Sequence, residues 1–263
     1  MAGPLPDIEL HASTQCDIRT PEKAAFLEKA GFSQMVLARE LSLAEVAACR
    51  AALHSARIEY FIHGALCVSY SGQCYISEAI TGRSANRGAC AQLCRLPYDV
   101  YTESGEQIAR RSHVLSLRDN NQTDNLEALI DAGVSSFKIE GRLKDLVYVK
   151  NITAWYRQQL DAIIARRPEL SRTSDGVSTF SFTPDPEKSF QRSRTDYFVH
   201  GRQFAKPYEL AQLESPKNTG SRVGCCERVE PGEILVRPAA GVSLANGDGL
   251  TYLGDDEEIH GLA

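Results

Sequence analysis

The first 166 residues alternate short apolar runs with amphipathic stretches, the pattern of strands followed by helices. Polar residues close each apolar run, and glycines or capping residues bound the amphipathic stretches. The runs predict strands over 7–13, 34–40, 58–64, 113–119 and 135–141. Because strands that alternate with helices form parallel sheets with right-handed crossovers, we expect an α/β fold.

The first two helices carry specific end signals. Thr20 is a good N-cap, Pro21 suits the first helical position, and Gly31 suits the C-terminal cap. Ser42 and Glu45 stand at capping-box spacing and predict the start of the second helix.

Two more helices follow the cysteine-rich middle of the chain. One is expected near 124–132, closed by Gly133. A long helix should run from about Asp145 to Arg166, where Trp155 packs. Its apolar side chains recur at helical spacing on one face: Val149, Ile152, Tyr156, Leu160 and Ile163.

The helix–strand alternation ends near residue 166, which divides the chain. A full (β/α) barrel takes about 250 residues, so 7–166 fits either an open sheet or a partial TIM-type (β/α) barrel, and we expect further strands before residue 1. The polar, proline-bearing stretch 167–194 reads as a linker. Short strands between Gly, Pro and Asn-Gly turns over 195–263 predict a small all-β, barrel-like domain.

Half of the eight cysteines lie in one glycine-punctuated segment, 59–95. Cys67, Cys74, Cys90 and Cys94 are separated by six, fifteen and three residues. Four thiolates on such a loop could hold a structural zinc ion or an iron–sulfur cluster, and the alternative is four unrelated reduced thiols. The segment has no C-x-x-C knuckle of the kind that zinc favours, so its spacing favours a [4Fe–4S] cluster.

Composition narrows the setting. Of the 263 residues, 43% are hydrophobic and 24% charged, enough for a core without disulfides. The formal net charge of -5 argues against non-specific coating of nucleic acid but allows a local basic groove. The first residues do not resemble a signal peptide and no apolar run reaches membrane-spanning length, so we expect a cytoplasmic protein without a membrane partner. Thiols stay reduced there, which favours metal-binding or catalytic cysteines.

The segment "EYFIHGALCVSYSGQCYIS", residues 59–77, resembles the signature of the peptidase U32 family, the collagenase-like proteases. Within that family, "RSANRGACAQLCRLPY" and "SFKIEGRLKDLVYVKNITAWYR" resemble the branch that hydroxylates a cytidine of 23S ribosomal RNA. The resemblance covers nearly all of residues 7–253. The chain matches every fixed position of the signature: Glu59, Phe61, Gly64, Cys67, Gly72, Cys74 and Ser77.

The resemblance carries expectations for the site. It implies a TIM-type core and a [4Fe–4S] cluster on four cysteines, which match Cys67, Cys74, Cys90 and Cys94 one for one. It also implies prephenate as a co-substrate in place of molecular oxygen, 23S ribosomal RNA or its precursor as the partner, and an electron donor that the sequence does not identify. Chains of the family begin upstream of residue 1, so a shortened barrel is expected, and the sequence does not say whether the shortened chain is active.

Polar residues stand where strands are expected to end, the place where barrel enzymes build their sites. Lys138 and Glu140 share one face by period-two geometry and could bind a carboxylate or move a proton, or form an ordinary salt bridge. His63 lies close enough to Cys67 in sequence for a Cys–His nucleophile pair, although a cluster ligand is not free to attack.

Basic residues flank the cysteines. Arg83, Arg87 and Arg95 could form a phosphate-binding rim for RNA, together with Lys144, Lys150 and Arg157, or simply a solvated face. Of the other thiols, Cys49 is expected in the core.

Three functions therefore compete. The first is an RNA-modifying enzyme that hydroxylates a cytidine of 23S ribosomal RNA with an iron–sulfur cluster. The second is a U32-type peptidase, although the chain has no H-E-x-x-H or G-x-S-x-G motif. The third is a non-catalytic fragment whose cysteines bind zinc.

Overall fold

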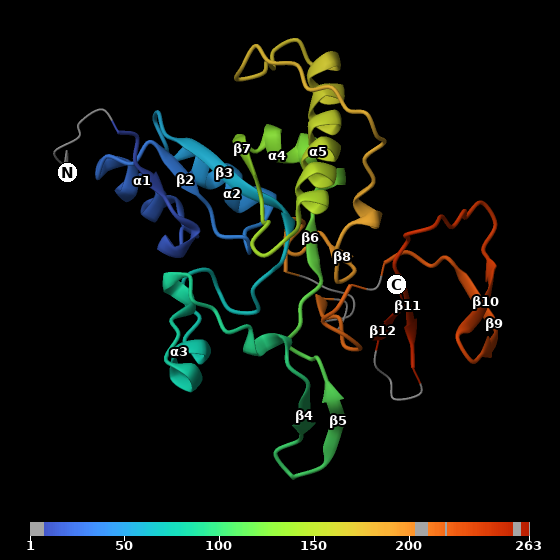
Figure 1. The fold of residues 1–263 in the computed structure, drawn as a ribbon. Helices are drawn as coiled ribbons and strands as arrows, with labels where there is room; N and C mark the ends of the chain where they lie inside the picture. Colours follow the sequence, from blue (N-terminus) through green and yellow to red (C-terminus); the bar gives the residue numbers. More distant parts are fainter. Residues whose placement is uncertain (1–7, 203–209, 219, 255–258, 263) are drawn as a thin grey trace.

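The structure, a computed structural model, describes residues 8–202, 210–218, 220–254 and 259–262. It is a mixed α/β fold with one parallel-strand sheet and several small antiparallel sheets (Figure 1). Four strands run parallel, as the alternating pattern predicts, and they pair in the order β1 (His11–Ala12), β2 (Gln34–Val36), β3 (Arg57–Gly64) and β7 (Val134–Ile139). Near its carboxyl end, β3 pairs antiparallel with the short strand β6 (Asp119–Asn121). On its other side β6 pairs parallel with β8 (Arg194–Thr195).

The helices begin and end close to their sequence signals. Thr20 caps α1 (Pro21–Lys29), and Ser42 forms the full capping box with Glu45 at the start of α2 (Leu43–Ala51). Both caps were predictable because they depend on side chains within three residues of the backbone they satisfy. The later helices are α3 (Ile76–Thr81), α4 (Leu126–Asp131) and α5 (Leu146–Arg166), and single 3₁₀ turns lie at 14–16, 85–87, 93–95, 123–125 and 186–188.

One continuous core lies between the sheet and helices α1, α2, α4 and α5. The fully buried Ile58, Tyr60 and Ile62 come from β3, and Cys49 is buried in α2 as expected. Ile152, Tyr156 and Ile163 pack into the core from α5, whereas Val149, expected on the same face of the helix, is 45% exposed. The first turn of α5 extends past the core, where Leu146 and Val147 are also exposed.

The predicted strand 113–119 was wrong. Only β6, which begins at Asp119, pairs with the sheet, and Leu117 makes an isolated bridge to Ala211. Ser116 and Leu117 are nevertheless buried. The guanidinium of Arg95, from the cysteine segment, donates hydrogen bonds to the Ser116 hydroxyl and the Leu117 carbonyl. Burial against a loop gives the same apolar signal as burial in a strand.

The stretch 167–194, expected as a linker, packs in its second half against α5. The Asn151 side chain donates to the Asp185 carbonyl at 2.6 Å and to the Ser189 hydroxyl at 2.7 Å. This contact brings Phe190 and Arg192 to the functional site described below. The segment is therefore ordered by side-chain bonds that carry no periodic sequence signal.

Three hairpins stand apart from the parallel sheet (Figure 1). One, formed by β4 (Tyr98–Tyr101) and β5 (Gln107–Ser112), projects from the body of the molecule. Within the described part of 195–263, β9 (Gly224–Glu230) pairs with β10 (Glu233–Pro238), and β11 (Leu250–Leu253) pairs with β12 (Ile259–Leu262). Those described strands form two separate two-stranded sheets.

Candidate functional site

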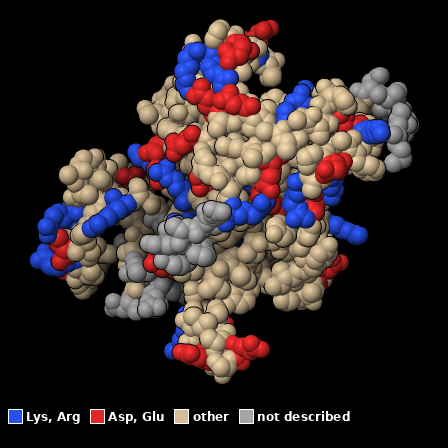
Figure 2. Space-filling view, turned by 180° about the vertical axis from the view of Figure 1, so that it is seen from behind, with Lys and Arg blue, Asp and Glu red and all other residues tan. Residues whose placement is uncertain are grey.

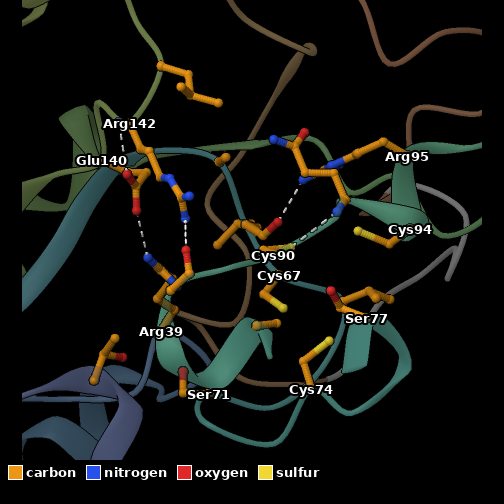
Figure 3. A pocket seen from close by; sticks show the side chains of 18 of the residues that line it. Arg39, Cys67, Ser71, Cys74, Ser77, Cys90, Cys94, Arg95, Glu140 and Arg142 are labelled. Atoms are coloured by element: carbon orange, nitrogen blue, oxygen red, sulfur yellow. Dashed lines mark hydrogen bonds and ion pairs between the residues drawn. The ribbon is translucent and has the colours of Figure 1, made fainter. Parts of the chain in front are cut away.

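A pocket of about 600 Å³ is lined by residues that follow the carboxyl ends of β2, β3 and β7. This is the end of a parallel sheet at which α/β proteins build their sites. All four cysteines of the segment 59–95 line this one pocket, although they are spread over 28 positions from Cys67 to Cys94. Figure 3 shows their side chains turned toward the same space.

The four thiols are near one another but not in tight contact. Each is partly buried, and within the described residues no three Cys, His, Asp or Glu side chains lie close enough to hold a single metal ion. Burial raises the pKa of Cys67, and the neighbouring Cys74 and Cys94 raise it further, against the effects of a backbone N–H and Arg39. Burial also raises the pKa of Cys94, while Arg95 lowers it. Without a bound cation, these two thiols therefore favour the neutral form.

Two buried side chains hold the cysteine loops in place. Glu40 accepts hydrogen bonds from the backbone N–H of Ser71 at 3.0 Å and from its hydroxyl at 2.9 Å. Ser77 donates to the Arg83 carbonyl at 2.7 Å and accepts from the Ala91 N–H at 3.0 Å. The first contact ties the Cys74 loop to the end of β2, and the second ties that loop to the segment that carries Cys90. The positions of the thiols therefore depend on polar groups that no periodic pattern reveals.

A chain of charged groups crosses one side of the pocket (Figure 3). The Arg39 Nη2 lies 3.2 Å from Glu140 Oε2, and the backbone N–H of Arg142 donates to Glu140 Oε1 at 3.0 Å. The Arg142 guanidinium donates to the Gly88 carbonyl at 2.6 Å. Arg39 also stacks over the Phe61 ring, 3.8 Å from its centre. These contacts fix the carboxylate at the pocket wall, between the Arg39 guanidinium and the Arg142 backbone N–H.

A second group of cations also lines the pocket, and sequence reasoning gave it little weight. Lys144 Nζ lies 3.2 Å from the centre of the Phe190 ring, and among the described residues it has no hydrogen-bond acceptor. Burial lowers the pKa of Lys144 to about 8, with Arg192 adding to the effect and Asp119 opposing it. Arg192 is held by the buried Asp119 at 3.2 Å. The site therefore presents an unneutralised ammonium group beside an aromatic face.

Lys138 and His63 are not part of the thiol pocket. Lys138 Nζ pairs with Glu59 Oε1 at 3.1 Å rather than with Glu140, in a cross-strand network. His63 is buried, with Nδ1 3.1 Å from the Tyr156 hydroxyl, and neither His63 nor Lys138 is among the residues that line the pocket. Burial lowers the pKa of His63 to about 4, and Lys144 adds to that effect, so the ring is neutral at pH 7. Of the three predicted catalytic residues, the structure places only Glu140 beside the cysteines.

The three arginines predicted to contact RNA differ. Arg87 is exposed, and Arg83 is exposed with one hydrogen bond to the Cys90 carbonyl at 3.3 Å. Arg95 instead points inward, where it donates to the carbonyls of Leu66 and Leu117, each at 2.7 Å. Arg95 therefore fastens the cysteine segment to the segment before β6.

Comparison with known proteins identifies the family of the chain. The family model of peptidase family U32 matches residues 2–208, more than three quarters of the sequence. The chain belongs to the U32 peptidase family. No solved structure matches it significantly.

Several curated relatives carry names from two kinds of activity. The chain is 57% identical over 249 residues to "23S rRNA 5-hydroxycytidine C2501 synthase" of Escherichia coli, a match that covers 95% of this chain and 37% of that protein. It is 36% identical over 166 residues to "tRNA hydroxylation protein P1" of Bacillus subtilis, across 61% of this chain and 39% of that protein. A "Collagenase" of Porphyromonas gingivalis is 36% identical over 271 residues, across 93% of this chain and 73% of that protein. The chain thus spans about two fifths of the length of the first two relatives.

Three residues of the U32 signature segment have clear structural roles. Gly64 ends β3 at φ +102°, and a Cβ there would lie 2.6 Å from the Glu140 carbonyl oxygen. At Gly72, φ +74°, a Cβ would lie 2.4 Å from the Gln15 carbonyl oxygen. Glu59 joins three strands, because Gln34 and Ser136 donate to its carboxylate alongside Lys138. The signature therefore describes how the loop leaves the sheet and folds back on it.

Proposed function

We propose that this chain is part of a cytoplasmic enzyme that hydroxylates a cytidine of 23S ribosomal RNA. In this proposal Cys67, Cys74, Cys90 and Cys94 hold a [4Fe–4S] cluster, and prephenate serves as co-substrate in place of molecular oxygen. The observation that carries the proposal is the convergence of four thiols in one cation-lined pocket, in a chain 57% identical to a 23S rRNA hydroxycytidine synthase. The parallel sheet would form part of a TIM-type barrel.

The donor set fits a cluster better than a single zinc ion. Tetrahedral zinc with Zn–S bonds of about 2.3 Å requires its sulfur atoms to lie within about 3.8 Å of one another. Among the described residues no three Cys, His, Asp or Glu side chains are placed to hold a single metal ion, yet the four thiols face one space. A cluster with one thiolate on each iron accepts wider spacing. When bound, it would supply one-electron transfer at the floor of the pocket.

The cations would bind the co-substrate. Prephenate carries two carboxylates, and Lys144 offers an ammonium group that has no acceptor among the described residues. Arg192 stands nearby and is fixed by Asp119, so its position does not depend on the ligand. The Phe190 ring lies under Lys144 and Arg192 and so would hold both cations in position for the carboxylates. Glu140 would hold the Arg39 guanidinium at the wall, and it also accepts a hydrogen bond from the Arg142 backbone N–H.

A U32-type peptidase is the second candidate, because two relatives from Porphyromonas gingivalis are named "Collagenase". A Cys–His pair would need His63 to reach Cys67. The His63 ring is buried against Tyr156, and burial lowers its pKa to about 4, so it is not placed to activate a thiol in the pocket. The geometry therefore favours the hydroxylase.

The test measures 23S rRNA nucleosides by mass spectrometry in cells that lack the full-length gene, with and without a plasmid that carries it. We expect loss of hydroxycytidine on deletion, restoration by the wild-type gene, and no restoration by Cys67→Ser or Cys74→Ser. Cys226→Ser, which changes an exposed thiol outside the pocket, is the matched control and should restore the modification. An unchanged nucleoside profile after deletion would refute the proposal.

Metal analysis of anaerobically purified protein separates the alternatives. The proposal predicts a brown protein with about four irons and four sulfides per chain. Zinc in their place would favour the non-catalytic fragment. A colourless protein that digests gelatin and loses this activity in Cys67→Ala would favour the peptidase.

A further inference from the structure

A second hollow, of about 1040 Å³, lies at the base of the β4–β5 hairpin. One wall comes from residues 95–97 and 110–113, and the other comes from residues 213–217 and Ile259. Arg95 lines both this groove and the thiol pocket. The two hollows therefore adjoin at one side chain.

A β-bulge turns two arginines into this groove. Tyr98 pairs with Ser112 and Val100 pairs with Ala109, so β5 has one residue more than β4 between the two pairs. Consecutive residues of a regular strand face opposite sides, but the bulge allows Arg110 and Arg111 to line the same groove. Arg111 has φ +44°, a left-handed conformation that is unfavourable for a side chain of this size. The backbone N–H of Arg111 donates to the Asp99 carboxylate at 2.7 Å, which holds the bulge.

The groove is basic in an acidic protein. Its described lining has four cationic side chains, Arg95, Arg110, Arg111 and Lys217, against one carboxylate, Glu214, whereas the whole chain has a net charge of -5. Among the described residues the exposed Arg110 guanidinium has no hydrogen-bond or ion-pair partner. Carboxylates gather instead at the free end of the hairpin (Figure 2). On this hairpin the arginines therefore lie at the base, beside the hollow, and the carboxylates lie at the free end.

Apolar side chains lie between these cations. Leu96 is 49% exposed and Leu213 is 40% exposed, and both line the groove. A strand of RNA offers alternating phosphates and flat base faces, so it matches cations interleaved with apolar surface. A folded acidic protein would match the charge but not a hollow that adjoins the thiol pocket at Arg95.

We propose that this groove binds the phosphate backbone of single-stranded RNA and guides the strand toward the thiol pocket. The inference rests on the proposed function, which makes RNA the substrate. Arg110 and Arg111 contact phosphates, and Arg95 marks the entrance to the pocket. The bulge, although strained, gives both arginines access to the same RNA strand.

The experiment measures binding of a fluorescein-labelled single-stranded RNA, with the sequence that flanks C2501 of 23S rRNA, by fluorescence anisotropy over a salt series. The variant is Arg110→Gln with Arg111→Asn, because asparagine tolerates the left-handed conformation. Each phosphate contact to a single strand contributes about 0.7 to the salt slope, so losing two should flatten the slope by about 1.4. At about 0.1 M salt this corresponds to about fivefold weaker binding for each contact, or about 25-fold in total.

The matched control is Arg228→Gln with Arg237→Gln, which removes two exposed arginines from the separate β9–β10 hairpin. It should bind RNA like the wild type. Arg110→Lys, which keeps the charge, should retain most of the affinity, and circular dichroism should show that all variants are folded. If the wild type binds RNA and the groove variant binds it equally well, the groove inference is wrong while the proposed function stands. If the wild type binds no RNA, both are wrong.

Discussion

Replacing Gly64 by alanine tests whether the end of β3 positions the cysteine pocket. The backbone there has φ +102°, which costs a non-glycine residue about 1–3 kcal/mol. The new Cβ would also lie 2.6 Å from the carbonyl oxygen and 2.8 Å from the Cβ of Glu140, and such overpacking costs about 1–3 kcal/mol more. We therefore expect Gly64→Ala to lower the free energy of unfolding by about 2–6 kcal/mol. The movement of Glu140 should also weaken its contact with Arg39 and, under the proposed function, reduce the iron content.

Gly82→Ala is the matched control, since Gly82 has φ +69° but a Cβ there meets nothing within 4 Å. It should show only the backbone cost of about 1–2 kcal/mol. Urea unfolding followed by circular dichroism gives both values, and iron analysis reports on the site. For a chain of this size each kcal/mol corresponds to about 2–4 °C in Tm. Equal destabilisation in the two variants, with full iron content in both, would refute the argument that β3 and Glu140 are packed against each other at this point.

Three further predictions concern the same region. Glu40→Gln should cost about 1–3 kcal/mol in urea unfolding, because the buried carboxylate accepts two hydrogen bonds from Ser71, whereas Glu103→Gln on the exposed hairpin should cost almost nothing. Ser77→Ala should cost about 1–3 kcal/mol and, under the proposed function, lower the iron content, because it leaves a part-buried carbonyl and N–H without their partner; Ser84→Ala, whose hydroxyl makes no such bridge, should not. The wild type should lose up to about 3 kcal/mol of stability as the pH falls from 6.5 to about 4. Over this range His63 is protonated in the unfolded chain but stays neutral in the folded protein, because burial lowers its pKa. His63→Phe should have a shallower pH dependence of its unfolding midpoint over that window, and an unchanged slope would contradict the low pKa of His63.

Local signals predicted the outer frame of the fold. Thr20, Ser42 and Asp145 each cap a helix by accepting a hydrogen bond from the backbone N–H three residues ahead, so a short window of sequence contains all the partners. The parallel order of the strands also follows from their alternation with helices. The segment 113–118 was misread because its burial comes from Arg95, which lies about twenty residues earlier in the chain.

One part of the candidate site could be predicted from the sequence and another part could not. The shared pocket of the four thiols was predictable, since they lie on one short segment after one strand. The second group of cations was not, because Lys144, Phe190 and Arg192 come together only through Asn151, which holds the region 185–189 against α5. Contacts between polar side chains far apart in sequence have no period, so neither spacing nor composition reports them.

The predicted RNA-binding rim of Arg83, Arg87 and Arg95 shows why charge beside a motif is weak evidence for contact. The guanidinium of Arg95 is used within the protein, since it donates to two carbonyls at 2.7 Å and to the Ser116 hydroxyl at 3.0 Å. Replacing it would remove these bonds and disturb the cysteine segment, so a loss of RNA binding in an Arg95 variant would not distinguish contact from misfolding. Arg110 has no such internal role among the described residues, and it borders the same hollow. A loss of affinity in Arg110→Gln, with iron content and stability intact, would therefore report on the RNA contact itself.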